Sequence, residues 1–254
     1  MLLAITRPVP PSITECELTH LERQPIDWAR ATEQHHEYEC ALQSLGCKVE
    51  RLPVAPSQPD SVFIEDTAFV VDECAVIARP GAVSRRGETS AVADALRPHR
   101  RLASIEAPGT LDGGDVVRIG RRIYVGLSSR TNADGIRQLS TILEPLGYRV
   151  ESVVVRECLH LKTAVSALGD EQLLLNPRMV DGTAFRGAPW IEIDPAEPFA
   201  ANVICVGDAV LCPANAPGTR RRLETQGYDV VPVDASELAK AEAGLTCCSI
   251  LLRV

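Results

Sequence analysis

Four stretches of the chain repeat one alternation of apolar and polar positions. Each begins with about five apolar residues, turns through two polar residues, and continues into a second apolar run that ends near Pro or Gly. Short apolar runs separated by tight polar turns are typical of β-hairpins. The pattern therefore predicts a hairpin at the start of residues 65–89, 112–138, 163–179 and 201–226.

A helix-like stretch and another β-branched run follow the first, second and fourth hairpins. These later runs read RLASIEA, YRVESVVV and YDVVPVD, and a Gly or Pro stands near the end of each preceding helix. The repeating unit is therefore strand, turn, strand, loop, helix and strand. A period of roughly 45–50 residues predicts about five such units in a chain of 254 residues.

The two ends of the chain each supply part of the fifth unit. The C-terminal GLTCCSILLRV is too short for a whole unit, and the N-terminal LLAITRPV reads as its missing strand. Pairing of these strands would close a ring and leave no free sheet edge at the seam. We therefore expect a single domain over residues 1–254, in which pseudo-symmetric α/β units surround a central channel.

The composition narrows the class of protein. Hydrophobic residues make up 45% of the chain, and its net charge of −8 without a basic run argues against nucleic-acid binding. No apolar stretch reaches the ~20 residues of a membrane helix, and the N-terminal apolar run is too short for a signal peptide. We expect a cytoplasmic protein that binds neither nucleic acid nor membrane.

The nine cysteines are too irregularly spaced for a disulfide framework. Their number is odd, no C-x-x-C pair occurs, and most lie in apolar strand-like runs, as small buried side chains do. Cys248, beside Cys247, is interpreted as such a filler, because vicinal cysteines bridge only with strain.

Residues with catalytic chemistry stand at equivalent positions of successive units. Glu65, Asp112, His160, Asn202 and Cys247 occur at or near unit starts, 42 to 48 residues apart. Equivalent positions in a ring face the same axis, so we expect these side chains to meet at one end of the channel. Cys247 with His160 and Asp112 combines a nucleophile, a base and an orienting acid. Each of the three alone also has a structural interpretation, as a strand cysteine, a core histidine and a turn aspartate.

Acidic and basic side chains form two groups that suit an α-amino acid with a cationic side chain. Asp60, Glu65 and Asp66 lie close together in PDSVFIED. Carboxylates suit a guanidinium, although the adjacent Glu65 and Asp66 reach one pocket only if the strand ends there. The arginines occupy equivalent loops of neighbouring units and suit a substrate carboxylate; they are Arg85, Arg86 and Arg130.

Seven motifs, spread over almost the whole chain, resemble those of the dimethylarginine dimethylaminohydrolase family. They are PDSVFIED at 59–66, RPGAVSRRGE at 79–88, TLDGGD at 110–115, SSRTNADG at 128–135, LHLKT at 159–163, AAN at 200–202 and GLTCCS at 244–249. The resemblance implies the fold of the guanidine-modifying (pentein) superfamily, a five-bladed α/β propeller of ββαβ units around a central channel.

The resemblance also implies a reaction and a role for each matching residue. The reaction is hydrolysis of asymmetric dimethylarginine and monomethylarginine to citrulline through a covalent cysteine intermediate, with no metal or other cofactor. Cys247 would be the nucleophile, His160 the general acid and then base, and Asp112 its acidic partner. The implied substrate-binding residues are Glu65 and Asp66 for the guanidinium with Asp60 and Phe63 beside them, Arg85 and Arg130 for the carboxylate, the backbone at Ala241 for the amine, and Leu18 in the lid.

Three other classes of protein remain open. Arginine deiminases share the fold and triad but are usually longer and carry Arg at the position of Glu65, and length also disfavours amidinotransferases. A zinc site could use Cys158, His160 and Cys247, and zinc captured by the last two would inhibit an enzyme. A non-enzymatic amino-acid-binding protein would leave Cys247 unexplained. The expected partner is a small-molecule substrate, and the expected state is a monomer or a homodimer.

Overall fold

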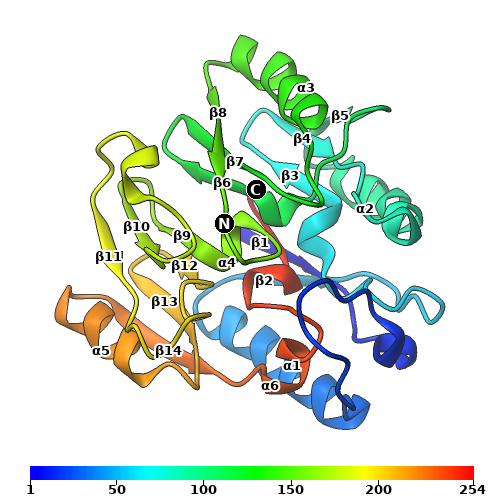
Figure 1. The fold of residues 1–254 in the computed structure, drawn as a ribbon. Coiled ribbons are helices and arrows are strands. Elements are labelled where there is room, and N and C mark those ends of the chain that lie inside the picture. Colours follow the sequence, from blue (N-terminus) through cyan, green and yellow to red (C-terminus); the bar gives the residue numbers. More distant parts are fainter.

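The strands form five separate three-stranded sheets arranged in a ring, in a computed structural model that describes residues 1–254 (Figure 1). In every sheet the central strand is antiparallel to one neighbour and parallel to the other. The sheets are β15 (Ile250–Arg253), β1 (Leu2–Thr6) and β2 (Lys48–Arg51); β3 (Ala68–Val70), β4 (Cys74–Ile77) and β5 (Arg101–Ser104); β6 (Val116–Ile119), β7 (Arg122–Leu127) and β8 (Arg149–Val154); β9 (Val165–Leu168), β10 (Gln172–Leu175) and β11 (Trp190–Glu192); and β12 (Ile204–Val206), β13 (Ala209–Pro213) and β14 (Asp229–Val233).

Helices connect the parallel strands, because a parallel pair needs a long crossover. Four crossovers contain α1 (Trp28–Ser44), α2 (Thr89–Leu96), α3 (Ala133–Leu143) and α5 (Pro217–Thr225), and these helices lie on the outside of the ring (Figure 1). The crossover from β10 to β11 contains a 3₁₀ turn at Gly182–Phe185 instead, in the unit whose sequence predicted no helix. The expected five-bladed α/β ring is therefore confirmed. Four blades are ββαβ units, and the blade of β9, β10 and β11 has a 3₁₀ turn in place of the helix.

Antiparallel pairing of β1 with β15 joins the two ends of the chain. Leu2 lies opposite Arg253 and Ile5 opposite Ile250, and both termini lie near the middle of the ring in Figure 1. The first blade therefore takes strands from both ends of the sequence.

Short helical turns precede the first strands of four blades, and the candidate residues at the starts of these four units lie in them or at their N-caps. These turns are η2 (Ile64–Thr67), η4 (Gly113–Asp115), α4 (Leu161–Ala164) and η7 (Thr246–Cys248). Asp112 and His160 are the N-cap residues of η4 and α4. Because equivalent turns lie at the same end of neighbouring blades, residues that are far apart in sequence meet there.

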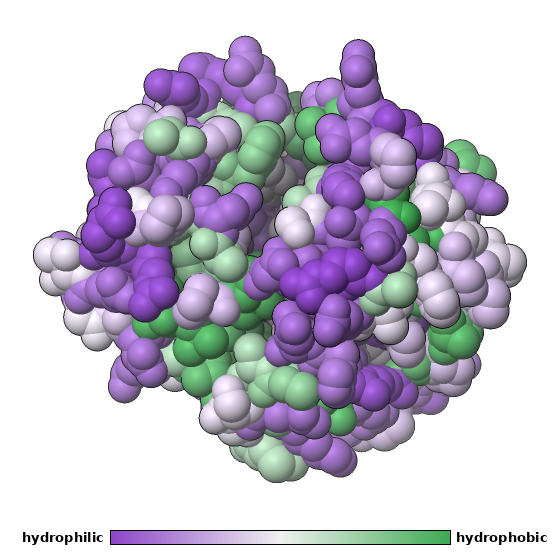
Figure 2. Space-filling view, turned by 90° about the horizontal axis from the view of Figure 1, so that it is seen from below, coloured by the Kyte–Doolittle hydropathy of each residue, from purple (hydrophilic) through white to green (hydrophobic).

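The hydrophobic core is divided into five clusters that are shared by neighbouring blades. One cluster, for example, joins two blades through Phe69, Val76, Val116 and Ile123. Seen from below, the surface is largely hydrophilic, and the hydrophobic residues exposed on it form separate groups (Figure 2). None of the helices, including the short α6 (Ser236–Ala239), has the length and apolar character needed to cross a membrane.

Candidate active site

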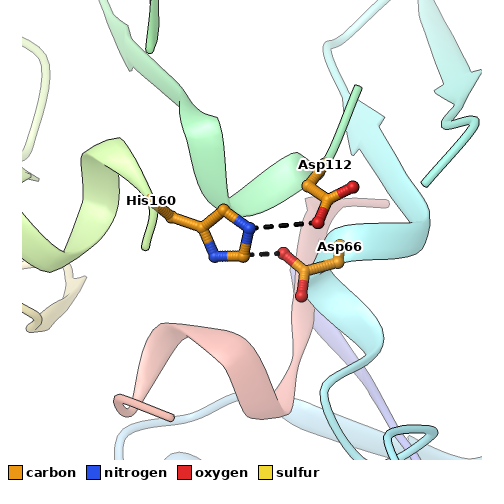
Figure 3. A group of neighbouring side chains, drawn as sticks. All are labelled: Asp66, Asp112 and His160. Atoms are coloured by element: carbon orange, nitrogen blue, oxygen red, sulfur yellow. Dashed lines mark hydrogen bonds and ion pairs between the residues drawn. The ribbon is translucent and has the colours of Figure 1, made fainter. Parts of the chain in front are cut away.

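His160 lies within a buried group of acids. Its Nε2 is 3.0 Å from Asp112 Oδ2, and its Nδ1 is 3.8 Å from Asp66 Oδ1 (Figure 3). The exposed fractions of the three residues are 5%, 0% and 3% in that order. Each residue comes from the turn before a different blade, so the repeat spacing brings them together.

The acids determine the charge of His160. Burial alone would lower the pKa of the imidazole, but Asp66, Asp112 and Asp115 outweigh burial and raise it to about 9. Burial would likewise raise the pKa of Asp66, but His160 and Arg85 lower it to about 2. At neutral pH the site therefore holds an imidazolium beside an ionised carboxylate, and the imidazolium can donate a proton.

Two residues of η4, Asp115 and Gly114, fix the position of His160. Asp115 is fully buried and accepts hydrogen bonds from the Leu161 N–H at 2.9 Å and from the Ser128 hydroxyl at 2.6 Å. A Cβ on Gly114 would come within 2.8 Å of His160 Nδ1, so glycine allows the turn to approach the ring. The start of α4 is thereby fixed against η4.

Cys247 lies in η7 and lines the same cavity as His160 and Asp66, which we call the site cavity. Its Sγ accepts a hydrogen bond from the Gly244 N–H at 3.4 Å. Burial, followed by the carboxylates of Glu65 and Asp66, raises the pKa of the thiol to about 12. The thiol is therefore protonated at neutral pH, and a cation bound beside it would favour the thiolate.

Glu65 faces a different set of partners from its neighbour Asp66. Its Oε1 accepts a hydrogen bond from Lys162 Nζ at 2.5 Å, and its Oε2 accepts one from the Thr246 hydroxyl at 2.6 Å. It lines a larger cavity of about 340 Å³ among the inner strands, whereas Asp66 lines the site cavity. The two side chains diverge because they lie in a 3₁₀ turn. Glu65 therefore contacts the turn that carries Cys247, through Thr246, but lies outside the site cavity.

The three candidate arginines differ in what they are free to bind. Arg85 is buried and already pairs with Asp66 at 2.5 Å and with Glu88 at 2.9 Å. The guanidinium of Arg130 donates one hydrogen bond, to a threonine hydroxyl in the adjoining loop at 3.1 Å. Arg86 donates to a backbone carbonyl and does not line the site cavity. Arg130 is therefore the arginine with most capacity left for a ligand.

The site cavity, of about 20 Å³, collects most of the residues expected from the sequence. Leu18 does not line it but packs against the core cluster around α1. Asp112 does not line it either, and its carboxylate is hydrogen-bonded to His160 Nε2. The expected residues on its walls are Asp60, Phe63, Asp66, Arg85, Arg130, His160, Ala241 and Cys247.

Several residues at the site were not predicted. Lys162 and Thr246 contact Glu65 and occur inside the motifs LHLKT and GLTCCS, which are the only local signal for them. Asp115 similarly occurs inside TLDGGD. Leu159, a further wall of the cavity, occurs inside LHLKT. The remaining walls come from Glu17, Glu242 and Ala243, for which no motif was recognised.

The structure does not bring Cys158, His160 and Cys247 around one point. Cys158 Sγ donates to the backbone carbonyl of His160 at 3.4 Å, and Cys158 lines a neighbouring cavity. Ligand atoms of Asp66, Asp112 and His160 do lie within 4.8 Å of one another. However, Asp66 is already paired with a buried arginine, and the raised pKa of His160 favours an imidazolium, which cannot bind a metal. All nine cysteines are free thiols.

A five-bladed α/β ring with cysteine, histidine and carboxylates at one end defines the pentein class of guanidine-modifying enzymes. The family model described as N,N dimethylarginine dimethylhydrolase, eukaryotic, matches residues 18–183. The chain belongs to the dimethylarginine dimethylaminohydrolase family, and is therefore a hydrolase that acts on C–N bonds.

Relatives extend the similarity over the full chain. The N(G),N(G)-dimethylarginine dimethylaminohydrolases of Pseudomonas aeruginosa and Streptomyces coelicolor are each 41% identical to it. The first alignment covers 88% of this chain and 89% of that protein, and the second covers 98% and 96%. A solved structure of a mutant of the Pseudomonas aeruginosa enzyme, complexed with citrulline, is 38% identical, covers 98% of both chains, and gives a TM-score of 0.94.

Proposed function

We propose that this chain hydrolyses asymmetric dimethylarginine and monomethylarginine to citrulline, with release of dimethylamine or methylamine. One observation carries this proposal: Cys247, His160 and Asp66 line a single cavity whose wall also contains Arg130. These groups supply a nucleophile, a proton donor, a carboxylate for a cation and a cation for a carboxylate.

The charges of the cavity suit the two ends of the substrate. Asp66 offers its carboxylate to the guanidinium. Glu65 adds negative charge near Cys247 from outside the site cavity. Both carboxylates raise the pKa of the Cys247 thiol, so both also attract a cation that is bound beside it. Arg130 holds the substrate carboxylate through charge-assisted hydrogen bonds. Arg85 contributes mainly by fixing Asp66, to which it is already paired.

Uncharged contacts complete the binding site. Phe63 lies on the cavity wall beside Asp60 and provides apolar surface near the guanidinium. The backbone carbonyl of Ala241, on the same wall, accepts a hydrogen bond from the substrate amine. Leu18 belongs to the loop that covers the ligand.

The first half-reaction breaks the bond between the guanidinium carbon and the methylated nitrogen. The bound cation favours loss of the Cys247 proton to solvent, and the thiolate attacks the central carbon. His160 is protonated because its pKa is about 9, and it gives its proton to the leaving amine as the C–N bond breaks. A thiouronium group remains on Cys247, beside a neutral His160.

The second half-reaction releases citrulline. Neutral His160 takes a proton from water, and the resulting hydroxide attacks the thiouronium carbon. The hydroxyl of the resulting tetrahedral intermediate loses its proton to solvent as the carbon–oxygen double bond of citrulline forms. The C–S bond breaks in the same step, and Cys247 leaves as thiolate. Asp112 keeps Nε2 as a donor, so the Nδ1 side of the ring exchanges the proton.

We also propose that residues 1–254 act as a single catalytic domain, as a monomer or a homodimer, without a metal or other cofactor. The ion pairs of the site support the proposal that no metal is needed, since the negative charges of Asp66 and Asp112 are already balanced by Arg85 and His160.

Incubation of the purified chain with asymmetric dimethylarginine should yield citrulline and dimethylamine in equal amounts. Because both half-reactions use only protein groups and water, removal of metals with a chelator should leave the rate unchanged. Binding of dimethylarginine without citrulline formation would favour an amino-acid-binding protein. Activity that disappears on chelation and returns with zinc would favour a metalloenzyme.

A further inference from the structure

One carboxylate holds three consecutive backbone groups at the edge of the site cavity. The N–H groups of Thr19, His20 and Leu21 donate to the side chain of Glu242 at 3.0, 2.5 and 2.5 Å. These residues belong to residues 17–21, which lie between η1 (Pro11–Glu15) and α1 and which we call the lid. Hydrogen bonds to a charged acceptor are stronger than neutral ones, so three on one carboxylate form a firm attachment.

Glu242 occupies a position that connects the lid with the nucleophile. It lines the site cavity, and two residues later the Gly244 N–H donates to Cys247 Sγ. Its φ is +59°, in the left-handed region that residues other than glycine rarely adopt. Such a conformation persists where the surroundings demand it, often at a functional position. Here, backbone hydrogen bonds at the end of α6, from the Glu242 N–H to Ala239 and from the Ala243 N–H to Leu238, fix this conformation. The Glu242 side chain then reaches the lid.

The lid occupies polar groups that a substrate would need. The Glu17 N–H donates to both carboxylate oxygens of Asp60 at 3.2 Å, and Arg130 donates to the Thr19 hydroxyl at 3.1 Å. With the lid in this place the site cavity measures only about 20 Å³, close to the ~10–15 Å³ that one water needs. A ligand of the size of arginine therefore enters or leaves only after the lid has moved away from Glu242.

We propose that Glu242 is a positioning residue that latches the lid over Cys247 and thereby controls access to it. The latch must release for each ligand to enter, and it must form again to exclude water from the reacting groups. This role goes beyond the proposed reaction, because it depends on the groups that hold the lid and not on the chemistry at Cys247.

Alkylation by iodoacetamide, a small neutral reagent, tests the latch without any substrate. Cys40 is exposed on α1 and does not line the site cavity, so its labelling is the internal reference for that of Cys247. The change Glu242→Ala removes the acceptor of all three lid hydrogen bonds. We expect the ratio of Cys247 to Cys40 labelling, located by peptide mass spectrometry, to rise about tenfold or more, equivalent to about 1.4 kcal/mol.

Two further variants serve as controls. Glu22 is exposed next to the lid and makes no hydrogen bond or ion pair, so Glu22→Ala removes a negative charge and should leave the ratio unchanged. Glu242→Gln keeps one acceptor oxygen without the charge, and it should give an intermediate ratio even if Glu242→Ala folds poorly. Thermal unfolding of each variant confirms that labelling reports on folded protein.

The pH profile of labelling separates an open lid from a changed thiol. An open lid multiplies the Cys247 rate by the same factor at every pH, whereas a changed pKa displaces the profile along the pH axis. An unchanged labelling ratio in both Glu242 variants, or an increase explained wholly by a displaced profile, would overturn the latch. Since no substrate is used, this outcome is independent of whether the chain hydrolyses methylarginine.

Discussion

Replacement of Cys247 by serine is expected to abolish citrulline formation and to leave the fold intact. The sulfur must ionise to attack, and a bound cation can bring a thiol to that point, whereas a serine hydroxyl ionises far less readily. Loss of the nucleophile should lower kcat by on the order of 10⁴-fold or more. The measurement is citrulline production by the variant, with circular dichroism to establish that the fold is retained.

The neighbouring cysteine provides the matched control for this variant. Cys248 is 2% exposed and belongs to the core cluster around α1, so it does not reach the site cavity. Cys248→Ala should keep most of the rate. Substantial turnover by a correctly folded Cys247→Ser variant would remove Cys247 from the nucleophilic role.

Replacement of His160 by glutamine is expected to lower kcat by about 10²–10⁴-fold, the usual contribution of a general acid and base. Glutamine can still donate a hydrogen bond to Asp112, but it can neither give a proton to the leaving amine nor take one from water. The measurement is single-turnover kinetics, in which both formation and hydrolysis of the cysteine adduct should slow. A variant that slows only one step would show that another group serves the other half-reaction.

The pH dependence of the wild-type chain provides a control on the same role. Protonated His160 is the acid, and kcat/KM reports the free enzyme. Thus kcat/KM should fall as pH rises through the pKa of His160, which is about 9. Asp112 is one of the groups that raise this pKa, so Asp112→Asn should move the fall in kcat/KM to lower pH. An alkaline limb that stays in place in this variant would contradict the assignment of His160 as the acid.

The ring could be predicted because each hairpin is local in sequence. Its apolar runs and polar turn lie within a few residues of one another, and the incomplete last unit required a strand from the other end. The convergence of His160, Asp112 and Cys247 followed from the same repetition, since equivalent turns share one end of the ring. Alternation along a strand already indicated that the adjacent Glu65 and Asp66 would point apart. It could not show that both lie in a 3₁₀ turn.

The partners of the site residues could not be predicted, because they come from other blades. Lys162 pairs with Glu65 across 97 positions of the sequence, and Glu242 reaches the lid across more than 220. Neither contact leaves a local pattern. The ion pairs that occupy Arg85 depend similarly on how η2 and η3 (Val83–Glu88) pack together, so an arginine expected to bind the substrate carboxylate is largely engaged within the protein.

The central claim, that methylated arginines are the substrates, is tested most directly by kcat/KM for arginine, monomethylarginine and asymmetric dimethylarginine on one preparation. Beside Asp66 the cavity wall is apolar at Phe63, Leu159 and Ala243. Each buried methyl group contributes about 0.8 kcal/mol, and the N–H groups of arginine left unpaired against these walls would cost about 1–3 kcal/mol. We therefore predict that asymmetric dimethylarginine exceeds arginine by at least about tenfold in kcat/KM. A higher kcat/KM for arginine than for either methylated substrate would contradict the account and make the chain an arginine deiminase.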